Sequence, residues 1–346
     1  MADRLPVTRT VREVTGTGAP DLAALVALDE PVVLRGHAAD WPLVRAGLGS
    51  ARAAADYVLR FDGGRPVTGY IGAPEIQGRF HYDATATALN FQAQSFALRD
   101  FLARLLAEGD GPAGTGASLY MGSTDLDAYL PGFRAENDLV PPDGLFARHP
   151  PLASIWIGNR TIASAHYDMA NNAAICAVGR RRFTLFPPDQ IGNLYPGPLA
   201  PTPGGQVVSM VDIARPDLDR HPRFAEAVAH AQVAELEPGD MLVYPALWWH
   251  HVEALDGFNI LVNYWWNAAP DFLDTPMDTV MHAILSLRDR PPAEKRAWRA
   301  IFDHYVFGDA AAVTAHLPAA VHGPLAPLDA QNARRLRAYL LHRLNR

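Results

Sequence analysis

Short β-rich runs bounded by glycine and proline succeed one another from Ala117 to about Trp266. Many short strands separated by turns are typical of a sandwich or barrel, whereas βαβ units would alternate strands with long helical patterns. We therefore expect a mainly β core with helical flanks. The clearest predicted strands are residues 117–121, 153–157, 173–178, 182–186, 206–211, 240–244 and 258–264.

Helical patterns flank this core on both sides. Residues 21–29, 50–60 and 98–108 are predicted helices before it, with a strand at 31–36. After it, Thr275-Pro276 is a plausible cap with a first-turn proline. Two apolar stripes follow, each of which packs either on the barrel or against a second chain. They consist of Met277, Val280, Met281, Ile284 and Leu287, and of Trp298, Ile301, Phe302 and Tyr305.

Composition excludes several classes of protein. No apolar run approaches the ~20 residues that a membrane span needs. Cys176 is the single cysteine, so a disulfide scaffold is excluded, and with no apolar signal-peptide core at the start a cytoplasmic location is expected. The net charge of -7 disfavours a general nucleic-acid binder, whose phosphate contacts require a basic face.

A His-x-Asp pair and a distant histidine carry the strongest chemical signal. His166 and Asp168 share one face of a strand, because residues i and i+2 point the same way. A third histidine lies in Trp248-Trp249-His250-His251, 82 residues after Asp168. Two histidines and one carboxylate hold one face of a non-haem iron and leave the opposite face open. We therefore predict an iron site.

The same tripeptide occurs once more, at His81-Tyr82-Asp83. An Ala/Thr-rich segment follows this copy, without a strand hairpin or a basic residue. After Asp168, by contrast, come an apolar run, the Gly179 turn and three arginines. We therefore assign the metal to the later copy and expect the earlier one in a loop or edge strand.

Spacing alone does not choose between His250 and His251 as the third metal ligand, because neighbours in a strand face opposite sides and Pro245 interrupts the alternation.

If 2-oxoglutarate is the electron source for the iron reaction, its far carboxylate needs a cation deep in the barrel. Arg181 faces opposite to its two arginine neighbours, and a guanidinium binds a carboxylate in a fork. Tyr120 and Asn263 are polar groups in apolar strands and are either hydrogen-bonded core or pocket contacts.

Taken together, these motifs resemble the cupin-like, JmjC-type 2-oxoglutarate oxygenases, and among them the branch with the asparaginyl hydroxylase of hypoxia-inducible factor. The resemblance covers about residues 28–268 and implies a double-stranded β-helix with iron at one mouth. The segments that carry it are Pro31-Val32-Val33-Leu34-Arg35-Gly36, Asp40-Trp41-Pro42, His166-Tyr167-Asp168, Asn172, Gly179-Arg180-Arg181-Arg182, residues 185–190 and 194–196, and Trp248-Trp249-His250-His251.

The resemblance also implies roles for single residues. It selects His250 as the third iron ligand, with His166 and Asp168. It places Arg181 where the family has the lysine that anchors 2-oxoglutarate. Ala163 stands where the family has a hydroxyl residue, so that either Ser164 or Thr161 substitutes for it or the contact is lost. The remaining polar pocket positions that it implies are Tyr120, Asn172 and Asn263.

The predicted function is an Fe(II)- and 2-oxoglutarate-dependent oxygenase acting on a protein or peptide side chain, in preference to RNA or a small molecule. The alternatives are a cupin metalloenzyme that does not use 2-oxoglutarate and a metal-bound binding module without turnover. The expected parts are a flanking segment at residues 1–116, the catalytic β-helix at 117–268 and a helical region at 269–346. C-terminal helices of the resembled hydroxylase form its dimer, which favours a homodimer here.

Overall fold

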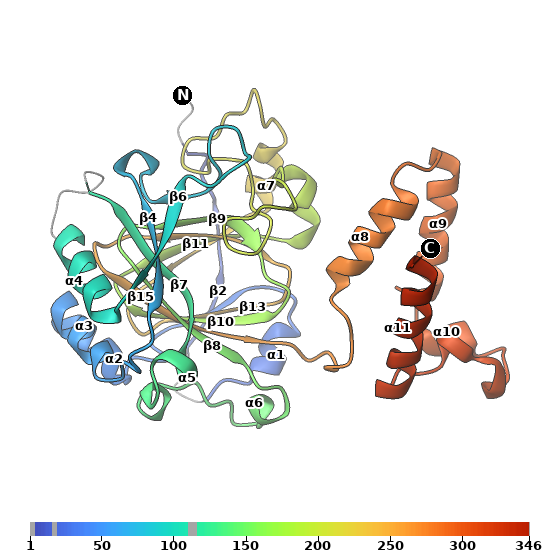
Figure 1. Ribbon diagram of the computed structural model, residues 1–346, viewed down its shortest axis with the longest axis horizontal. Coiled ribbons are helices and arrows are strands. Elements are labelled where there is room, and N and C mark those ends of the chain that lie inside the picture. The colour runs from blue at the N-terminus through green and yellow to red at the C-terminus, as the bar shows by residue number, and fades with distance from the viewer. Residues whose placement is uncertain (1–3, 16–18, 110–115, 346) are drawn as a thin grey trace. The chain divides into compact units, whose positions relative to one another are not determined.

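The computed structural model describes residues 4–15, 19–109 and 116–345 and separates into two compact units, Met1–Asn267 and Ala268–Arg346. Unit 1 contains the β structure and the described part of unit 2 is helical (Figure 1). The predicted fold class, a mainly β protein with helical flanks and C-terminal helices, is confirmed. The sequence predicts three parts, with boundaries at 116 and 268, whereas the structure separates into two units, so the division into three parts stays a prediction.

Two sheets form the core of the described part of unit 1. The smaller sheet has the spatial order β1 (Arg9–Thr10), β12 (Gln232–Leu236), β11 (Arg181–Phe186), β14 (Trp249–Ala254), β9 (Ile162–Tyr167) and β5 (Arg79–Phe80). The larger sheet has the order β2 (Arg12–Val14), β3 (Val32–Leu34), β13 (Met241–Tyr244), β10 (Asn171–Val178), β15 (Asn259–Trp266), β8 (Leu152–Gly158), β7 (Ser118–Asp125), β4 (Val67–Gly72) and β6 (Phe91–Phe96).

The two faces of β10 explain its unbroken apolar sequence. Ala174 and Cys176 pack between the sheets, against Phe183 of β11 and other side chains. Ala173 and Ile175 pack on the outer face, under helices. A strand that is buried on both faces needs apolar residues at every position rather than at every second one.

Helices and short turns cover the outer faces of both sheets. The outer core of the larger sheet includes residues of α1 (Leu22–Val26), α2 (Pro42–Gly49), α3 (Ala51–Leu59), α4 (Leu98–Gly109), α5 (Leu126–Tyr129), η2 (Phe133–Ala135) and α6 (Leu145–Arg148). The outer core of the smaller sheet includes residues of α7 (Phe224–His230), on the opposite side of unit 1 from α3 and α4 in Figure 1. The remaining turns of unit 1 are η1 (Pro74–Ile76) and η3 (Pro188–Asn193).

Two local irregularities position the interior side chains. Gly179 has φ +70°, a left-handed conformation that favours glycine, and it turns β10 into β11. The pairing of β14 with β9 shifts between His250 and Val252, which leaves an additional residue in β9. A bulge of this kind re-aims side chains, and both Ala163 and Ser164 line the interior cavity as a result.

The predicted strand at residues 206–211 is wrong. Val208 bridges His166, and Ser209 bridges Pro196, each as an isolated pair. The backbone hydrogen bonds of this segment are divided between two partners, so no continuous ladder forms. The other predicted strands are present, whereas β4, β6, β9, β12 and β14 were not among the clearest runs.

The first helix of unit 2 begins at the residue that the sequence predicts. Unit 2 contains α8 (Pro276–Leu287), α9 (Pro292–Tyr305), α10 (Ala310–Thr314), η4 (Ala319–Val321), η5 (Gly323–Leu325) and α11 (Ala330–Leu344). Thr275 is the N-cap of α8 and Pro276 its first residue. Among the described residues, no helix is both long and apolar enough to cross a membrane.

Candidate metal and cosubstrate site

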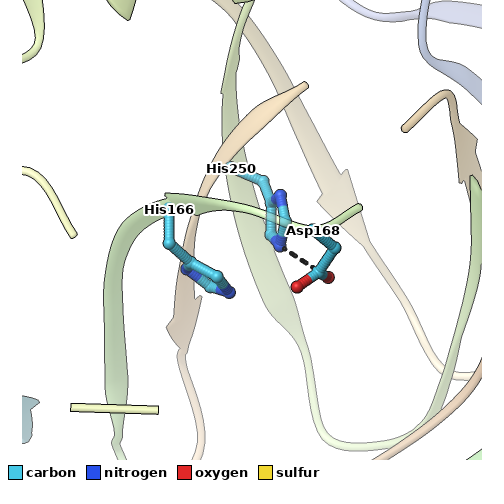
Figure 2. A group of neighbouring side chains, drawn as sticks. All are labelled: His166, Asp168 and His250. Atoms are coloured by element: carbon cyan, nitrogen blue, oxygen red, sulfur yellow. Dashed lines mark ion pairs between the residues drawn. The ribbon is translucent and has the colours of Figure 1, made fainter. Parts of the chain in front are cut away.

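His166, Asp168 and His250 converge at the end of two neighbouring strands (Figure 2). His166 of β9 lies directly opposite His250 of β14 in the antiparallel ladder, and their ring centroids are 4.2 Å apart. Asp168 follows the last residue of β9, and its Oδ2 lies 3.5 Å from Nε2 of His250. One potential ligand atom from each residue lies within 4.8 Å of the other two. This group fits a single metal ion.

Backbone contacts fix the orientation of both imidazoles. Nδ1 of His166 is 2.8 Å from the carbonyl oxygen of Ser164, and Nδ1 of His250 is 3.0 Å from that of Trp248. A carbonyl oxygen only accepts, so each Nδ1 carries the proton. In the neutral form of such a ring the lone pair lies on Nε2, which is the tautomer a metal ligand requires.

The protonation states suit metal binding as well. Burial, together with the charge of His250, lowers the pKa of His166 to about 4, although the Asp168 carboxylate opposes the shift. Burial alone would raise the pKa of Asp168, but hydrogen bonds and charges from His250, His166 and Trp265 outweigh it and lower the pKa. At neutral pH the site therefore offers a neutral imidazole at His166 and a carboxylate.

Two side chains hold the carboxylate of Asp168 in place. The indole Nε1 of Trp265 donates to its Oδ2 at 3.0 Å, and the amide nitrogen of Asn172 lies 3.5 Å from the same oxygen. Sequence reasoning missed Trp265. Its position in the sequence could have revealed it, because Trp265 lies two residues after Asn263 in β15 and so shares the strand face of a predicted pocket residue.

A cavity of about 520 Å³ lies in front of the triad. Its size falls in the range of roughly 300–1,000 Å³ that is typical of small-molecule sites. Residues from both sheets line it, and so do Thr202, Pro203, Gly204, Gly205 and Gln206 of the segment after η3. The predicted pocket residues Tyr120, Asn172, Arg181, Asn263 and Ser164 are all part of this lining.

Arg181 is the cation of this cavity. Its side chain is 2% exposed, and its Nε and Nη2 have no hydrogen-bond partner. Its neighbours Arg180 and Arg182 instead pair with Asp256 and Glu235 at 2.9 and 3.1 Å. Two buried guanidinium nitrogens whose N–H groups have no acceptor are costly unless a ligand accepts from them. The position fits the carboxylate of a bound molecule.

Polar and aromatic groups surround this guanidinium. Burial raises the pKa of Tyr120 to about 12, while the charge of Arg181 and a hydrogen bond with it act in the opposite direction. Tyr120 stacks on Trp156, whose Nε1 donates to Oδ1 of Asn263 at 2.7 Å. Oδ1 of Asn172 is buried without a partner. Asn172 therefore retains a polar contact for a ligand, whereas Tyr120 contacts Arg181 and Asn263 orients Trp156.

The hydroxyl residues near Ala163 have different positions. Ala163 and Ser164 both line the cavity, but Thr161 does not. Oγ of Ser164 accepts a hydrogen bond of 3.3 Å from Nε of Arg79. Of these two candidates for the role of the family hydroxyl, only Ser164 lines the cavity, and its role stays a prediction.

The competing histidines lie outside the triad. His251 is on the opposite face of β14, with Nε2 at 4.0 Å from Oε2 of Glu253. His81 follows the edge strand β5, and its Nε2 is 3.0 Å from the carbonyl oxygen of Ser209. Asp83 accepts from the hydroxyl of Thr85 at 2.8 Å and so organises a turn.

Comparisons with known proteins agree with the fold. A family model described as a cupin-like domain matches residues 20–272, more than half of the chain. Human HSPB1-associated protein 1 is 31% identical over 159 residues, which are 45% of this chain and 32% of that protein. The chain also aligns over more of its length with proteins of two other animals.

Lysine-specific demethylase 8 of Xenopus tropicalis is 25% identical over 243 residues, 69% of this chain and 48% of that protein. Jumonji C domain-containing protein 5 of Drosophila melanogaster is 27% identical over 246 residues, 68% of this chain and 54% of that protein. The chain thus spans between about a third and about a half of the length of these relatives.

Proposed function

This chain belongs to the cupin-like domain family, and on that premise we propose that it is an Fe(II)- and 2-oxoglutarate-dependent oxygenase that hydroxylates a protein or peptide side chain. One observation carries the proposal. A buried arginine with two unsatisfied N–H groups and a His-Asp-His group that fits a metal line the same cavity. Their combination favours a keto acid that is chelated at one end and held as a carboxylate at the other.

In this proposal His166, Asp168 and His250 hold Fe(II). Bound iron, together with 2-oxoglutarate and dioxygen, supplies the oxidising power for inserting an oxygen atom into a C–H bond. The far carboxylate of 2-oxoglutarate accepts hydrogen bonds from Arg181, with Tyr120 beside it. Trp265 and Asn172 keep the Asp168 carboxylate oriented, as outer hydrogen bonds to metal ligands commonly do.

The aromatic wall of the cavity has a protective role. Tyr120, Trp156 and Trp265 form a continuous row, with ring centroids 5.8 Å and 5.6 Å apart. These rings exclude water from the side of the site that faces the larger sheet, which strengthens the electrostatic interactions inside.

A protein substrate is favoured by two considerations. The name of lysine-specific demethylase 8 refers to an amino-acid residue, lysine, and the name of HSPB1-associated protein 1 refers to association with HSPB1. The cavity of about 520 Å³ is also large for a five-carbon diacid, so room remains for a side chain. Among the described lining residues Asp168 is the only acid, and we assign it to the metal. An uncharged side chain, and hence hydroxylation rather than lysine demethylation, suits this lining.

The deciding experiment measures oxygen consumption and succinate formation by the chain loaded with Fe(II), with and without 2-oxoglutarate. Consumption that depends on 2-oxoglutarate is expected. Oxygen chemistry that proceeds equally without it would instead indicate a cupin enzyme of another kind, and metal binding without any consumption would indicate a binding module. Metal content alone does not distinguish the three.

A further inference from the structure

The free edge of β6 (Phe91–Phe96) differs from the other sheet edges in the described chain. The edges at β1, β2 and β5 are two or three residues long, and each carries an arginine. β6 has six residues, with no charge and no proline, and pairs with β4 without a register shift. Proteins usually protect long edges with charge, proline or a bulge, because a bare edge accepts another strand. A long and unprotected edge is therefore a candidate site for binding another strand.

The exposed residues of this edge are small or polar. Gln92, Ala93, Gln94 and Ser95 are all exposed, and Figure 1 shows β6 beside β4 at the front of unit 1. Such a surface stays compatible with water when nothing is bound to it. Its main-chain groups remain accessible for pairing with an incoming chain.

The inward side of β6 is continuous with the candidate active site. Phe91 and Ala93 line the same cavity as His166 and the rest of the triad. Phe91 contacts Tyr70 and Phe80, with ring centroids 5.4 Å and 5.2 Å apart. Because residues i and i+2 of a strand share a face, a strand added beside β6 would direct every second side chain toward this cavity.

We propose that an extended segment of the substrate protein binds by adding as a strand to the edge of β6 and directs one side chain into the cavity. This inference rests on the proposed function for its substrate class. Main-chain hydrogen bonds give affinity in this mode of recognition, and pockets for alternate side chains give specificity.

The segment that fits is uncharged around the modified residue. β6 contributes no charge, and neither do Tyr70, Leu89 or residues 202–206 at the cavity. A charged side chain would lose water here without gaining a partner, because we assign Asp168 to the metal and Arg181 to the cosubstrate.

The test uses short fluorescent peptides of threonine, valine and glutamine, with the central residue varied and the backbone amides N-methylated one at a time. Binding to the full chain is measured by fluorescence anisotropy without added metal. N-methylation of alternate amides should weaken binding by at least about tenfold, and of the intervening amides by less than about twofold.

A double variant, Gln92→Lys with Gln94→Lys, should weaken peptide binding to a similar degree, because lysines on an edge oppose strand addition. The matched control is Thr10→Lys on the edge strand β1, which should bind as the unaltered chain does. Equal unfolding midpoints for both variants show that the loss is local. The N-methylation series uses the unaltered chain, so its outcome does not depend on whether a variant folds.

Three results would overturn the inference: no binding by any peptide, an N-methylation profile without alternation, or unchanged affinity in the double variant. A dimer that dissociates on the Gln92 and Gln94 substitutions would also overturn it, since the occupant would then be a second copy. Alternating peptide binding without 2-oxoglutarate turnover would contradict the proposed function and leave the docking site standing.

Discussion

Adjacent residues of β14 have different tasks because a strand turns them to opposite faces. His250 lies with His166 and Asp168 in the cavity, whereas His251 points toward Glu253 on the other face. The same alternation directs Arg181 inward and leaves Arg180 and Arg182 paired with acids. Of residues of the same type, only the one whose side chain faces the cavity, His250 or Arg181, is available to the site.

Replacing His250 with alanine should remove one of three metal ligands. The expected loss of metal affinity exceeds the roughly 10–100-fold that loss of an outer-shell partner costs. Equilibrium dialysis with Fe(II) or Co(II) measures it. His81→Ala is the control, because it removes a buried histidine from the other His-x-Asp copy and should leave metal binding intact. If the control loses the metal and His250→Ala keeps it, the assignment is wrong.

Replacing Arg181 with alanine should weaken 2-oxoglutarate binding by at least ~2 kcal/mol, the usual cost of a lost buried and charged hydrogen bond. Titration calorimetry under anaerobic conditions checks this, with Arg182→Ala as the neighbour that pairs with Glu235 instead. Arg181→Lys restores the family's residue, and retained activity would show that the site accepts either cation. Unchanged binding in Arg181→Ala would exclude it as the anchor.

The buried His81 should make the metal-free protein sensitive to acid. Burial and the charge of Arg79 lower its pKa from the ordinary histidine value of about 6.5 to about 4, although backbone hydrogen bonds oppose the shift. Between these values the unfolded chain binds a proton that the folded chain does not. Stability is therefore complete above pH 6.5 and is lost as the pH falls toward 4, by about 3 kcal/mol for this group.

Urea unfolding at several pH values measures this loss, and His81→Gln separates His81 from the other buried histidines. The free energy of unfolding of the variant should depend less steeply on pH between 6.5 and 4. His37, His166, His221 and His251, whose pKa values burial lowers as well, contribute to the remaining slope. An identical slope in the variant would contradict the prediction.

At the scale of elements, the turn between β10 and β11 sets the register of Arg181. A Cβ on Gly179 would lie 2.4 Å from Oδ1 of Asn259 and 2.7 Å from the carbonyl oxygen of Phe258. The left-handed backbone adds about 1–3 kcal/mol of strain for another residue. Gly179→Ala should therefore cost more than strain alone and weaken 2-oxoglutarate binding by displacing β11.

Gly64 provides the matched control for this substitution. Its φ is +73°, against +70° at Gly179, but an added Cβ would meet nothing within 4 Å. Gly64→Ala should show the strain without the clash and leave 2-oxoglutarate binding unchanged. Thermal unfolding and cosubstrate titration of both variants check this, and equal destabilisation would show that the contacts with Asn259 and Phe258 adapt.

At the scale of the whole molecule, unit 2 lacks a core of its own. Val313 and Ala333 are its only buried apolar residues within the described chain. The predicted stripes remain open to solvent in α8 and α9, with Met281 51% and Tyr305 54% exposed. Apolar helix faces of this extent need a partner surface.

We predict that this partner is a second copy, giving a two-fold dimer through the C-terminal helices. The intact chain should have a dimeric mass in solution at micromolar concentration, and a chain truncated near Phe272 should be a monomer. Met281→Glu with Trp298→Glu should shift the intact chain toward monomer, since the charges fall on the stripes. A monomeric mass for the unaltered chain would contradict the prediction.

The sequence alone determined the features that depend on local pattern. Short runs between glycine and proline predicted a mainly β core, and the apolar run at residues 173–178 predicted the strand β10. His166 and Asp168 were predictable as a pair, because i and i+2 share a strand face whatever the fold around them. The Gly179 turn and strand alternation predicted only that Arg181 faces opposite to Arg180 and Arg182, and its place beside the cosubstrate came from the family resemblance.

Only the tertiary structure decided what depends on distant segments. It brings β14 beside β9 with His250 opposite His166, a choice that Pro245 left open in the sequence. It divides the bonds of residues 206–211 between two partners, and it places Trp265 and Phe91 in the walls of one cavity. These outcomes depend on register and bulges between strands, which are set by packing across the whole core and leave no periodic trace in the chain.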